Sequence, residues 1–416
     1  MTKTSHNIIV SFPFNNQNVK AVITALEQED WLYKYHTLVA IDKKNSLLKS
    51  LPKSIQAEFL RRSLPIEQSK VITSKFKNFE FLRLILNKFG FRGQNDAMIK
   101  YISENFDSSF SKHLTSIADK NYIDAVYGYE DTSQKTFEVA KSLGIKCIYD
   151  LPIAYWSHSK KLMKEEIQRL PEWKTTMLSG IDDSEEKLNR KEREIELADI
   201  IICASNFVKN SIPENIPRDK ILISPFGTPE KLSFAPNKSH NAKRPLRVLF
   251  AGGMSQRKGL GDLFSAMKLL NNKNVELVVL GSLMAPMNFY RNQFANFIHE
   301  PGRPHEEVLK LMQTCDVFCL PSIVEGRALV MQEAMSQGLP LIITPNTGGD
   351  DLIIEGKTGF LIDIRSPEAI AEKIEWFSNN RDKIEEMGSN AKQLAISYTW
   401  KNYSTQILHG INNLLN

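Results

Sequence analysis

Short apolar runs alternate with longer segments of mixed polarity along the chain. In the first half these runs are HNIIVSFP, YHTLVAID, DAVYGYE, KCIYDLP, DIIICAS and ILISPFG. Segments between them, such as NVKAVITALEQ, have apolar residues at helical spacing, and three helices are predicted between about residues 54 and 118. Continuous apolar strands separated by helices indicate a parallel sheet with helices on both faces. The pattern therefore predicts an α/β chain.

A break in this rhythm divides the chain into two parts. The segment FAPNKSHNAKRP, residues 234–245, is rich in Pro, Asn, Ser and Lys and is typical of a linker. The apolar runs that follow it are LRVLFAGG, VELVVLGS, CDVFCLPS, LPLIITP and GFLID. We therefore predict two doubly wound, Rossmann-like domains, residues 1–233 and 246–397, which face a deep cleft at the carboxyl ends of their strands.

The last predicted helix, within residues 398–416, has two possible places in this architecture. It could cross back and complete the first domain, with Trp400 as a packing anchor, or it could be an ordinary final helix of the second domain. The pattern alone leaves both open.

The composition is that of a soluble globular protein, with 42% hydrophobic and 24% charged residues among 416. The N-terminus has no basic start followed by a long apolar stretch, and no apolar run approaches the roughly 18 residues of a membrane span. The four cysteines lie inside apolar, strand-like runs, which favours free buried thiols over disulfides. These features predict a cytoplasmic location.

Positive charge is concentrated near the N-terminus. Residues 1–100 contain 16 Lys and Arg against 8 Asp and Glu, although the net charge of the chain is only +5. The basic residues alternate with Leu, Ile and Phe in residues 43–65 and 70–93. Such segments can contact an anionic membrane, here its inner face, or an acidic acceptor. They can equally be packed helices with solvated basic faces. No nucleic-acid-binding motif accompanies the charge.

The run LFAGGMSQRKGLGDLFSAMKLL has the form of a phosphate-binding element. An apolar strand leads into Gly252 and Gly253, then into a loop with Arg257 and Lys258, then into an amphipathic helix. Glycines allow close approach of a ligand, and adjacent cations supply positive charge for a diphosphate. The run matches neither the dinucleotide fingerprint nor the P-loop.

Two glutamates bracket seven residues in EGRALVMQE. Glu325 follows a buried strand and lies in a turn, whereas Glu333 lies about five residues into a predicted helix capped by Gly338. The amides at the start of this helix would face a phosphate, and the carboxylates would accept sugar hydroxyls. We therefore predict a nucleotide-sugar site, whose binding residues are Gly253, Arg257, Lys258, Glu325, Gly326, Arg327, Ala328, Leu329, Val330 and Glu333. Arg327 would either contact the ligand or balance the charge of Glu325.

These residues resemble a known family. EGRALVMQEAM is similar to the E-x7-E element of family 4 glycosyltransferases, which are retaining enzymes of the GT-B fold. The resemblance extends through FAGGMSQRKGL, CDVFCLPS, GLPLIITPNTGG and GKTGFLIDIRSPEAIAEKI, and in the first domain through ELADIIICASNFVKNSI and ILISPFGTPEKLSF. It is specific over residues 196–363 and diffuse elsewhere.

The resemblance implies roles for individual positions. Lys258 corresponds to the donor-phosphate lysine, Glu325 to the glutamate near the transferred sugar, and Glu333 to the ribose-binding glutamate. The arginine usually found five residues before the lysine is Gly253 here, and Arg257 is expected to replace it. Two further matches are Gly227, a glycine of the interdomain cleft, and Trp400, the aromatic residue before the final crossing helix.

The first domain departs from the family pattern at its expected active-site loop. The loop after the first strand, SFPFNNQNVK, contains Asn15, Asn16 and Asn18 but no glycine. For the family's histidine near the reacting carbon, the best local candidate is His158 in YDLPIAYWSHSKK; an ordinary structural histidine is the alternative. The nearby EEIQRLPEW resembles a sub-group of these enzymes but assigns no chemistry.

Taken together, the residues and the resemblance predict a retaining, metal-independent glycosyltransferase. It would move a sugar from a nucleotide diphosphate donor to a glycan or lipid-linked acceptor in cell-surface polysaccharide or glycoconjugate synthesis, without a cofactor. Glu325, Arg257, Lys258 and His158 are the candidate catalytic residues. A non-catalytic, nucleotide-sugar-binding subunit is the alternative. A glycan phosphorylase would need a pyridoxal-phosphate lysine and a much longer chain.

Overall fold

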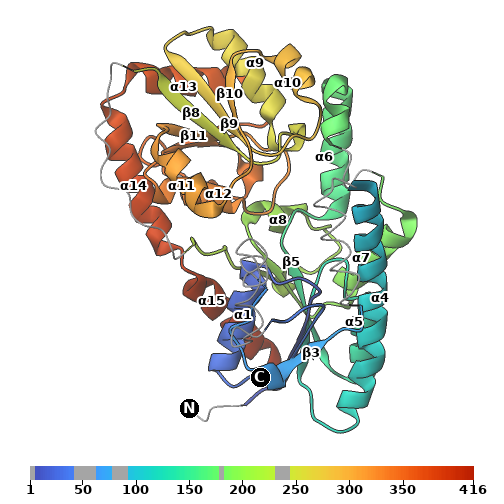
Figure 1. The fold of residues 1–416 in the computed structure, drawn as a ribbon. Helices are drawn as coiled ribbons and strands as arrows, with labels where there is room; N and C mark the ends of the chain where they lie inside the picture. The colour runs from blue at the N-terminus through green and yellow to red at the C-terminus, as the bar shows by residue number, and fades with distance from the viewer. Residues whose placement is uncertain (1–4, 42–61, 77–91, 178–181, 230–243) are drawn as a thin grey trace, which may run out of the picture.

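The computed structural model describes residues 5–41, 62–76, 92–177, 182–229 and 244–416. Two α/β domains follow each other along the chain, and the second lies above the first in Figure 1. Most of the predicted linker, and much of the two basic segments near the N-terminus, lie outside the described residues. None of the described helices is long and apolar enough to cross a membrane.

The first domain is built on a parallel sheet in the order β3-β2-β1-β4-β5-β6-β7. Its strands are β1 (Ile8–Ser11), β2 (Leu32–Thr37), β3 (Val71–Thr73), β4 (Ala125–Tyr129), β5 (Lys146–Leu151), β6 (Ile200–Cys203) and β7 (Ile221–Ile223). Its described helices are α1 (Gln17–Gln28), η2 (Gln68–Lys70), α4 (Arg92–Ala118), α5 (Gln134–Ser142), α6 (Trp156–Arg169), η3 (Pro171–Thr176), α7 (Glu185–Leu197), α8 (Asn206–Ser211) and η4 (Arg218–Lys220).

The second domain repeats this topology, with its parallel sheet in the order β10-β9-β8-β11-β12-β13. The strands are β8 (Leu246–Ala251), β9 (Val275–Leu280), β10 (Phe297–Glu300), β11 (Val317–Leu320), β12 (Leu341–Ile343) and β13 (Gly359–Leu361). The helices are η5 (Gln256–Lys258), α9 (Leu260–Leu270), α10 (Met287–Gln293), α11 (His305–Gln313), α12 (Leu329–Ser336), η6 (Pro345–Thr347), η7 (Asp350–Leu352), α13 (Pro367–Asn379) and α14 (Lys383–Ser397).

The C-terminal helix α15 (Trp400–Leu415) crosses back to the first domain, where it packs against α1. Trp400 is buried, and its ring stacks on Phe226 with 6.0 Å between the ring centroids. The two doubly wound sheets and the crossing helix confirm the predicted fold class, and they settle the place of the last helix in favour of the crossing.

Two strands were missing from the prediction. β3 forms at Val71–Thr73, inside the region for which only helices were predicted, and β10 forms at Phe297–Glu300. Both are edge strands of their sheets. An edge strand needs only one partner and can be short and partly polar, so its apolar pattern is weak.

The helical hairpin formed by α6 and η3, residues 156–176, belongs to the first domain by sequence but packs into the second. Leu162, Met163 and Trp173 are buried in the same apolar cluster as the second domain's sheet. In Figure 1, α6 rises from the first domain along the side of the second. The two domains are thus joined by a shared core as well as by the chain crossings.

A buried polar cluster joins α15 to the first sheet. Asp150, at the end of β5, is 2% exposed and accepts a hydrogen bond from the Tyr127 hydroxyl at 2.7 Å. The hydroxyl of Tyr403 on α15 lies 3.4 Å from the same carboxylate oxygen. Because burial disfavours the charged form, the pKa of Asp150 is raised to about 7.

This cluster predicts a pH dependence of stability. Between about pH 4 and pH 7 the folded protein retains a proton on Asp150 that the unfolded chain releases. The stabilisation due to the neutral carboxyl is therefore complete at low pH and is lost as the pH rises through about 7. We expect Asp150→Asn to remove that loss. Between pH 5 and 8 the free energy of unfolding of the wild type, measured by thermal unfolding, should fall on the order of a few kcal/mol relative to that of the variant. If the stabilities of the two proteins changed in parallel with pH, this assignment would be wrong.

Candidate functional site

The basic loop after β8 is shaped by its glycines. Gly252 has a φ of +150°, and a Cβ placed there would lie 2.6 Å from Cδ of Lys258, so the glycine makes room for the lysine stem. Gly259 has a φ of +73°, and its missing Cβ leaves space for the carbonyl oxygen of Pro321. The loop is therefore folded back against the segment that follows β11.

Lys258 and Arg257 both pair with Glu325. The Lys258 ammonium contacts Oε1 of Glu325, and Nη1 of Arg257 lies 3.0 Å from the same oxygen. Backbone bonds hold this arrangement, because the amide of Ile323 donates to the Arg257 carbonyl at 2.9 Å. β8 and β11 are neighbours at the point where the strand order reverses, which is where doubly wound sheets bind ligands.

Glu333 is the fifth residue of α12, on the helix predicted for it, and Gly338 ends that helix with a φ of +77°. One carboxylate oxygen of Glu333 lies 3.1 Å from Nε2 of His305, the first residue of α11. This hydrogen bond raises the pKa of the half-exposed His305. The carboxylate of Glu333 is thus held by His305.

The amides at the start of α12 are not all open. The Ala328 amide donates to the carbonyl of Thr347 at 3.2 Å, so this amide is occupied within the protein and not open to a phosphate as predicted. Leu329 and Val330 are the first two residues of the helix, and such amides have no partner within a helix. The predicted phosphate contacts through the Leu329 and Val330 amides stay predictions.

Arg327 pairs with Asp351 and not with Glu325. Its buried guanidinium donates to the carboxylate of Asp351 and to the Gly348 carbonyl, and its Nε donates to Gln332. The guanidinium also lies over the ring of Tyr398 at 4.8 Å. The charge of Arg327 is thus balanced by Asp351, which rules out the alternative that it balances Glu325, whereas its contact with the ligand stays a prediction.

Glu325 and Gly326 lie where the two domains touch. The amide of Ala154, which follows β5, donates to the Glu325 carbonyl at 3.3 Å. The hydroxyl of Ser205, after β6, donates to the Gly326 carbonyl at 2.6 Å. A Cβ on Gly326 would lie 1.8 Å from the carbonyl oxygen of Pro152. The carboxyl ends of strands from both sheets therefore meet at this turn.

The remaining predicted residues lie around this interface or support it. His158, near the start of α6, packs its ring against Phe207, and burial lowers its pKa, which favours a neutral imidazole. A Cβ on Gly227 would lie 2.3 Å from the amide nitrogen of Trp400, so this glycine permits the final crossing. Gly253 has open space around it, the nearest side chain being Met284 at 3.8 Å from an added Cβ.

The asparagine-rich loop after β1 has a structural role. Asn16 caps α1 by accepting from the Val19 amide, and Asn15 donates to the Val39 carbonyl at 2.7 Å. The hydroxyl of Tyr35 donates to the Asn15 side chain at 2.7 Å. These bonds fix the loop without a glycine.

Several residues that organise the site were missed by sequence reasoning. The buried Gln332 donates to the Phe226 carbonyl and to Thr228, which ties α12 to the end of the first domain. Gln256, adjacent to Arg257, is bonded to Glu166 of α6. All three residues lie in segments quoted for the resemblance, Gln332 in EGRALVMQEAM, Gln256 in FAGGMSQRKGL and Glu166 in EEIQRLPEW, but none of the three was assigned a role.

The two doubly wound domains meet at the carboxyl ends of their strands, and a basic loop and a strand-to-helix turn of the second domain lie at the junction. This architecture is the GT-B fold. Residues 233–394 match the family model described as glycosyl transferases group 1. The second domain therefore belongs to this family, and the resemblance to family 4 glycosyltransferases is confirmed.

Curated relatives match about half of the chain. A glycosyltransferase of Methanocaldococcus jannaschii is 29% identical over 206 residues, which are 49% of this chain and 56% of that protein. The capsular polysaccharide biosynthesis glycosyltransferase CapM of Staphylococcus aureus is 26% identical over 212 residues, which are 47% of this chain and 56% of CapM. The chain thus spans about half the length of these relatives.

The fold likeness covers the chain from end to end. The crystal structure of Anabaena HepE in complex with UDP superimposes with a TM-score of 0.60 at 14% identity, over 98% of this chain and 100% of HepE. At this level of identity the likeness establishes the fold.

The tight contact at Gly326 predicts that its substitution separates the domains locally. In Gly326→Ala the new Cβ would meet the Pro152 carbonyl, and neither backbone can move without breaking the Ala154 and Ser205 bonds. We expect a loss of about 1–3 kcal/mol of stability, typical of overpacking, measured by denaturant unfolding. Gly302→Ala is the matched control, because an added Cβ there meets nothing within 4 Å. Equal stability of the two variants would contradict the interpretation.

Proposed function

We propose that the protein is a retaining glycosyltransferase that transfers a sugar from a nucleoside diphosphate donor to a hydroxyl of a glycan or lipid-linked acceptor. We further propose a role in the synthesis of a cell-surface polysaccharide or glycoconjugate, on the cytoplasmic side of the membrane. The observation that carries the proposal is the meeting of Lys258 and Arg257 with Glu325 at the domain junction, beside the helix that bears Glu333.

The chemistry follows from the charges at this junction. Transfer breaks the bond between the sugar's anomeric carbon and the β-phosphate oxygen, so negative charge grows on the leaving diphosphate. Lys258 and Arg257, with the Leu329 and Val330 amides, are suited to stabilise that charge. In a same-face substitution, the leaving phosphate oxygen accepts the proton of the attacking hydroxyl. Glu325 would hold the sugar next to the reacting carbon, and Glu333 would accept hydrogen bonds from the ribose hydroxyls.

Features outside the junction agree with this proposal. CapM, one of the relatives, is named as an enzyme of capsular polysaccharide biosynthesis, and HepE, with the same fold, was crystallised with UDP. The neutral form of His158 would suit a hydrogen bond to a sugar hydroxyl near the first domain. A contact between the basic N-terminal segments and an anionic membrane would bring a lipid-linked acceptor close, and it stays a separate prediction.

Removing either end of the donor site should weaken donor binding. We expect Lys258→Ala and Glu333→Ala each to weaken nucleoside diphosphate binding about tenfold or more, because each loses a charge-assisted hydrogen bond of ~1.5–3 kcal/mol. Calorimetry with UDP, GDP and ADP and with the corresponding nucleotide sugars measures the effect and identifies the base.

Matched controls are available on neighbouring helices. Lys268→Ala removes an exposed lysine from α9, and Glu306→Ala removes an exposed glutamate from α11; neither should change binding. If no nucleoside diphosphate binds the wild type, the assignment of the donor site is wrong. If donors bind but no glycan or lipid acceptor supports turnover, a non-catalytic subunit is favoured.

The pairing of Glu325 with both cations leads to a further prediction for Glu325→Gln. A bound diphosphate must compete with this carboxylate for Lys258 and Arg257. The amide cannot compete as a charge, so we expect the affinity for the nucleoside diphosphate alone to rise several-fold, on the order of 1 kcal/mol, while transfer is lost. Calorimetry and a transfer assay separate the two effects. Weaker nucleotide binding by this variant would show that Glu325 is not a competitor for the cations.

A further inference from the structure

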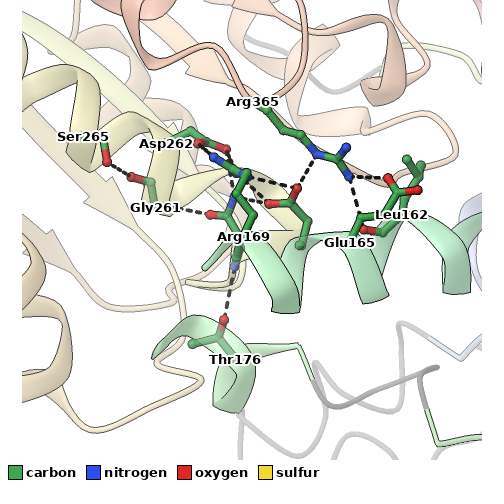
Figure 2. Close-up of polar contacts among 10 residues, drawn as sticks. Leu162, Glu165, Arg169, Thr176, Gly261, Asp262, Ser265 and Arg365 are labelled. Carbon is green, nitrogen blue, oxygen red and sulfur yellow. Dashed lines mark hydrogen bonds and ion pairs between the residues drawn. The ribbon is translucent and has the colours of Figure 1, made fainter. Parts of the chain in front are cut away.

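The loop that carries Arg257 and Lys258 is held in place by the first domain's α6–η3 hairpin. Gln256, directly before the two cations, has its side chain completely buried. Its backbone amide donates to Oγ1 of Thr176, at the end of η3, at 3.2 Å. Its side-chain oxygen accepts from the Gly261 amide at 2.8 Å. Figure 2 shows Thr176 at the bottom of the network, with the dashed hydrogen bond from the Gln256 amide ending on its hydroxyl.

The Gln256 side-chain nitrogen donates to two buried carboxylates at once. It lies 2.8 Å from Oε2 of Glu166, on α6, and 2.8 Å from Oδ2 of Asp262, on α9. Glu166 is 0% exposed and Asp262 is 1% exposed. Two carboxylates this close and this deeply buried repel each other unless cations lie between or beside them.

Two arginines supply those cations. Arg169 makes a bidentate pair with Asp262, at 2.7 and 2.8 Å, and also donates to Glu166 at 2.7 Å. Arg365, from the segment after β13, donates to Glu166 and pairs with the neighbouring Glu165 at 2.9 Å. Figure 2 shows Arg365 approaching α6 from above and Asp262 facing Arg169. The two arginines thus balance the charges of the two buried carboxylates.

The position of Gln256 distinguishes this network from a simple clamp between domains. A clamp could attach anywhere on α9, whereas three bonds of this network end on the residue before the two site cations. The backbone of Arg257 is in turn bonded to Ile323, and its side chain to the Val324 carbonyl. The basic loop therefore lies between two supports, the hairpin on one side and the Glu325 turn on the other.

We infer that Glu166 and Thr176 are positioning residues for donor binding: acting through Gln256, they hold the loop whose cations bind the diphosphate. The inference rests on the proposed function and extends it, because it makes part of the first domain a support of the second domain's ligand site. Neither residue contacts the ligand. Both fix the direction from which Arg257 and Lys258 approach it, and rigid support of this kind determines how well a site fits its ligand.

The test compares neighbouring substitutions in the full-length chain. Glu166→Gln keeps the shape but places an amide opposite Arg169, Arg365 and Gln256, which are all donors. Thr176→Val removes the acceptor for the Gln256 amide, and Thr176→Ser restores it. The probe is whichever of UDP, GDP and ADP binds the wild type most tightly, with Kd measured by calorimetry. The Tm of each variant is measured in parallel.

We expect Glu166→Gln and Thr176→Val to raise the Kd roughly tenfold or more, as misplacement of a binding group does. Thr176→Ser should bind like the wild type. Glu165→Gln is the matched control: it lies next to Glu166 and shares Arg365, but it has no bond to Gln256. Its Kd should be unchanged even if its Tm falls.

The outcomes separate the inference from the proposed function. If the wild type binds a nucleoside diphosphate but Glu166→Gln and Thr176→Val bind it equally well, with only their Tm lowered, the hairpin is a structural clamp and the inference is overturned. A Kd for Thr176→Ser as weak as that for Thr176→Val would also overturn it. If the wild type binds none of the three nucleotides, the proposed function fails, and the inference fails with it.

Discussion

Two buried carboxylates from different domains share one guanidinium in this protein, and the arrangement of the two domains depends on that sharing. Glu166 and Asp262 are almost completely shielded from water, and Arg169 bonds to both. Removing the Arg169 side chain would leave both carboxylates buried without this shared partner, and such a loss typically costs about 3–5 kcal/mol. The electrostatic balance and the apolar packing of Trp173 beside it thus favour the same geometry.

The candidate site itself is a balanced set of charges before any ligand binds. Lys258 and Arg257 neutralise Glu325, His305 bonds to Glu333, and Arg327 is neutralised by Asp351. A diphosphate bound there, as proposed, would exchange partners with charged groups that are already in place. The first domain contributes backbone and hydroxyl contacts to the Glu325 turn, so the site's geometry depends on both domains.

The sequence predicted the features that repeat locally and missed those that depend on tertiary contacts. Buried parallel strands and the strand–glycine–basic–helix element have patterns that lie within a short stretch of sequence. The fold, the place of Glu333 on its helix and the Gly338 cap could therefore all be predicted. The partners of Arg327 and of the Ala328 amide come from residues about 20 positions later, at Thr347, Gly348 and Asp351. Glu166 and Gln256 are 90 residues apart, and nothing in either local sequence indicates the other.

The hairpin also changes what counts as a folding unit. The residues that match the family, 233–394, contain the second domain's sheet but not α6 and η3, which supply Leu162, Met163 and Trp173 to its core. Expressed alone, this part of the chain would have an apolar groove and an unpaired Asp262 where the hairpin belongs. Because α15 returns to the first domain as well, each domain is completed by a segment from the other side of the linker. Loss of one domain's structure therefore uncovers the core of the other, and a single cooperative unfolding transition is the natural consequence of this exchange of segments.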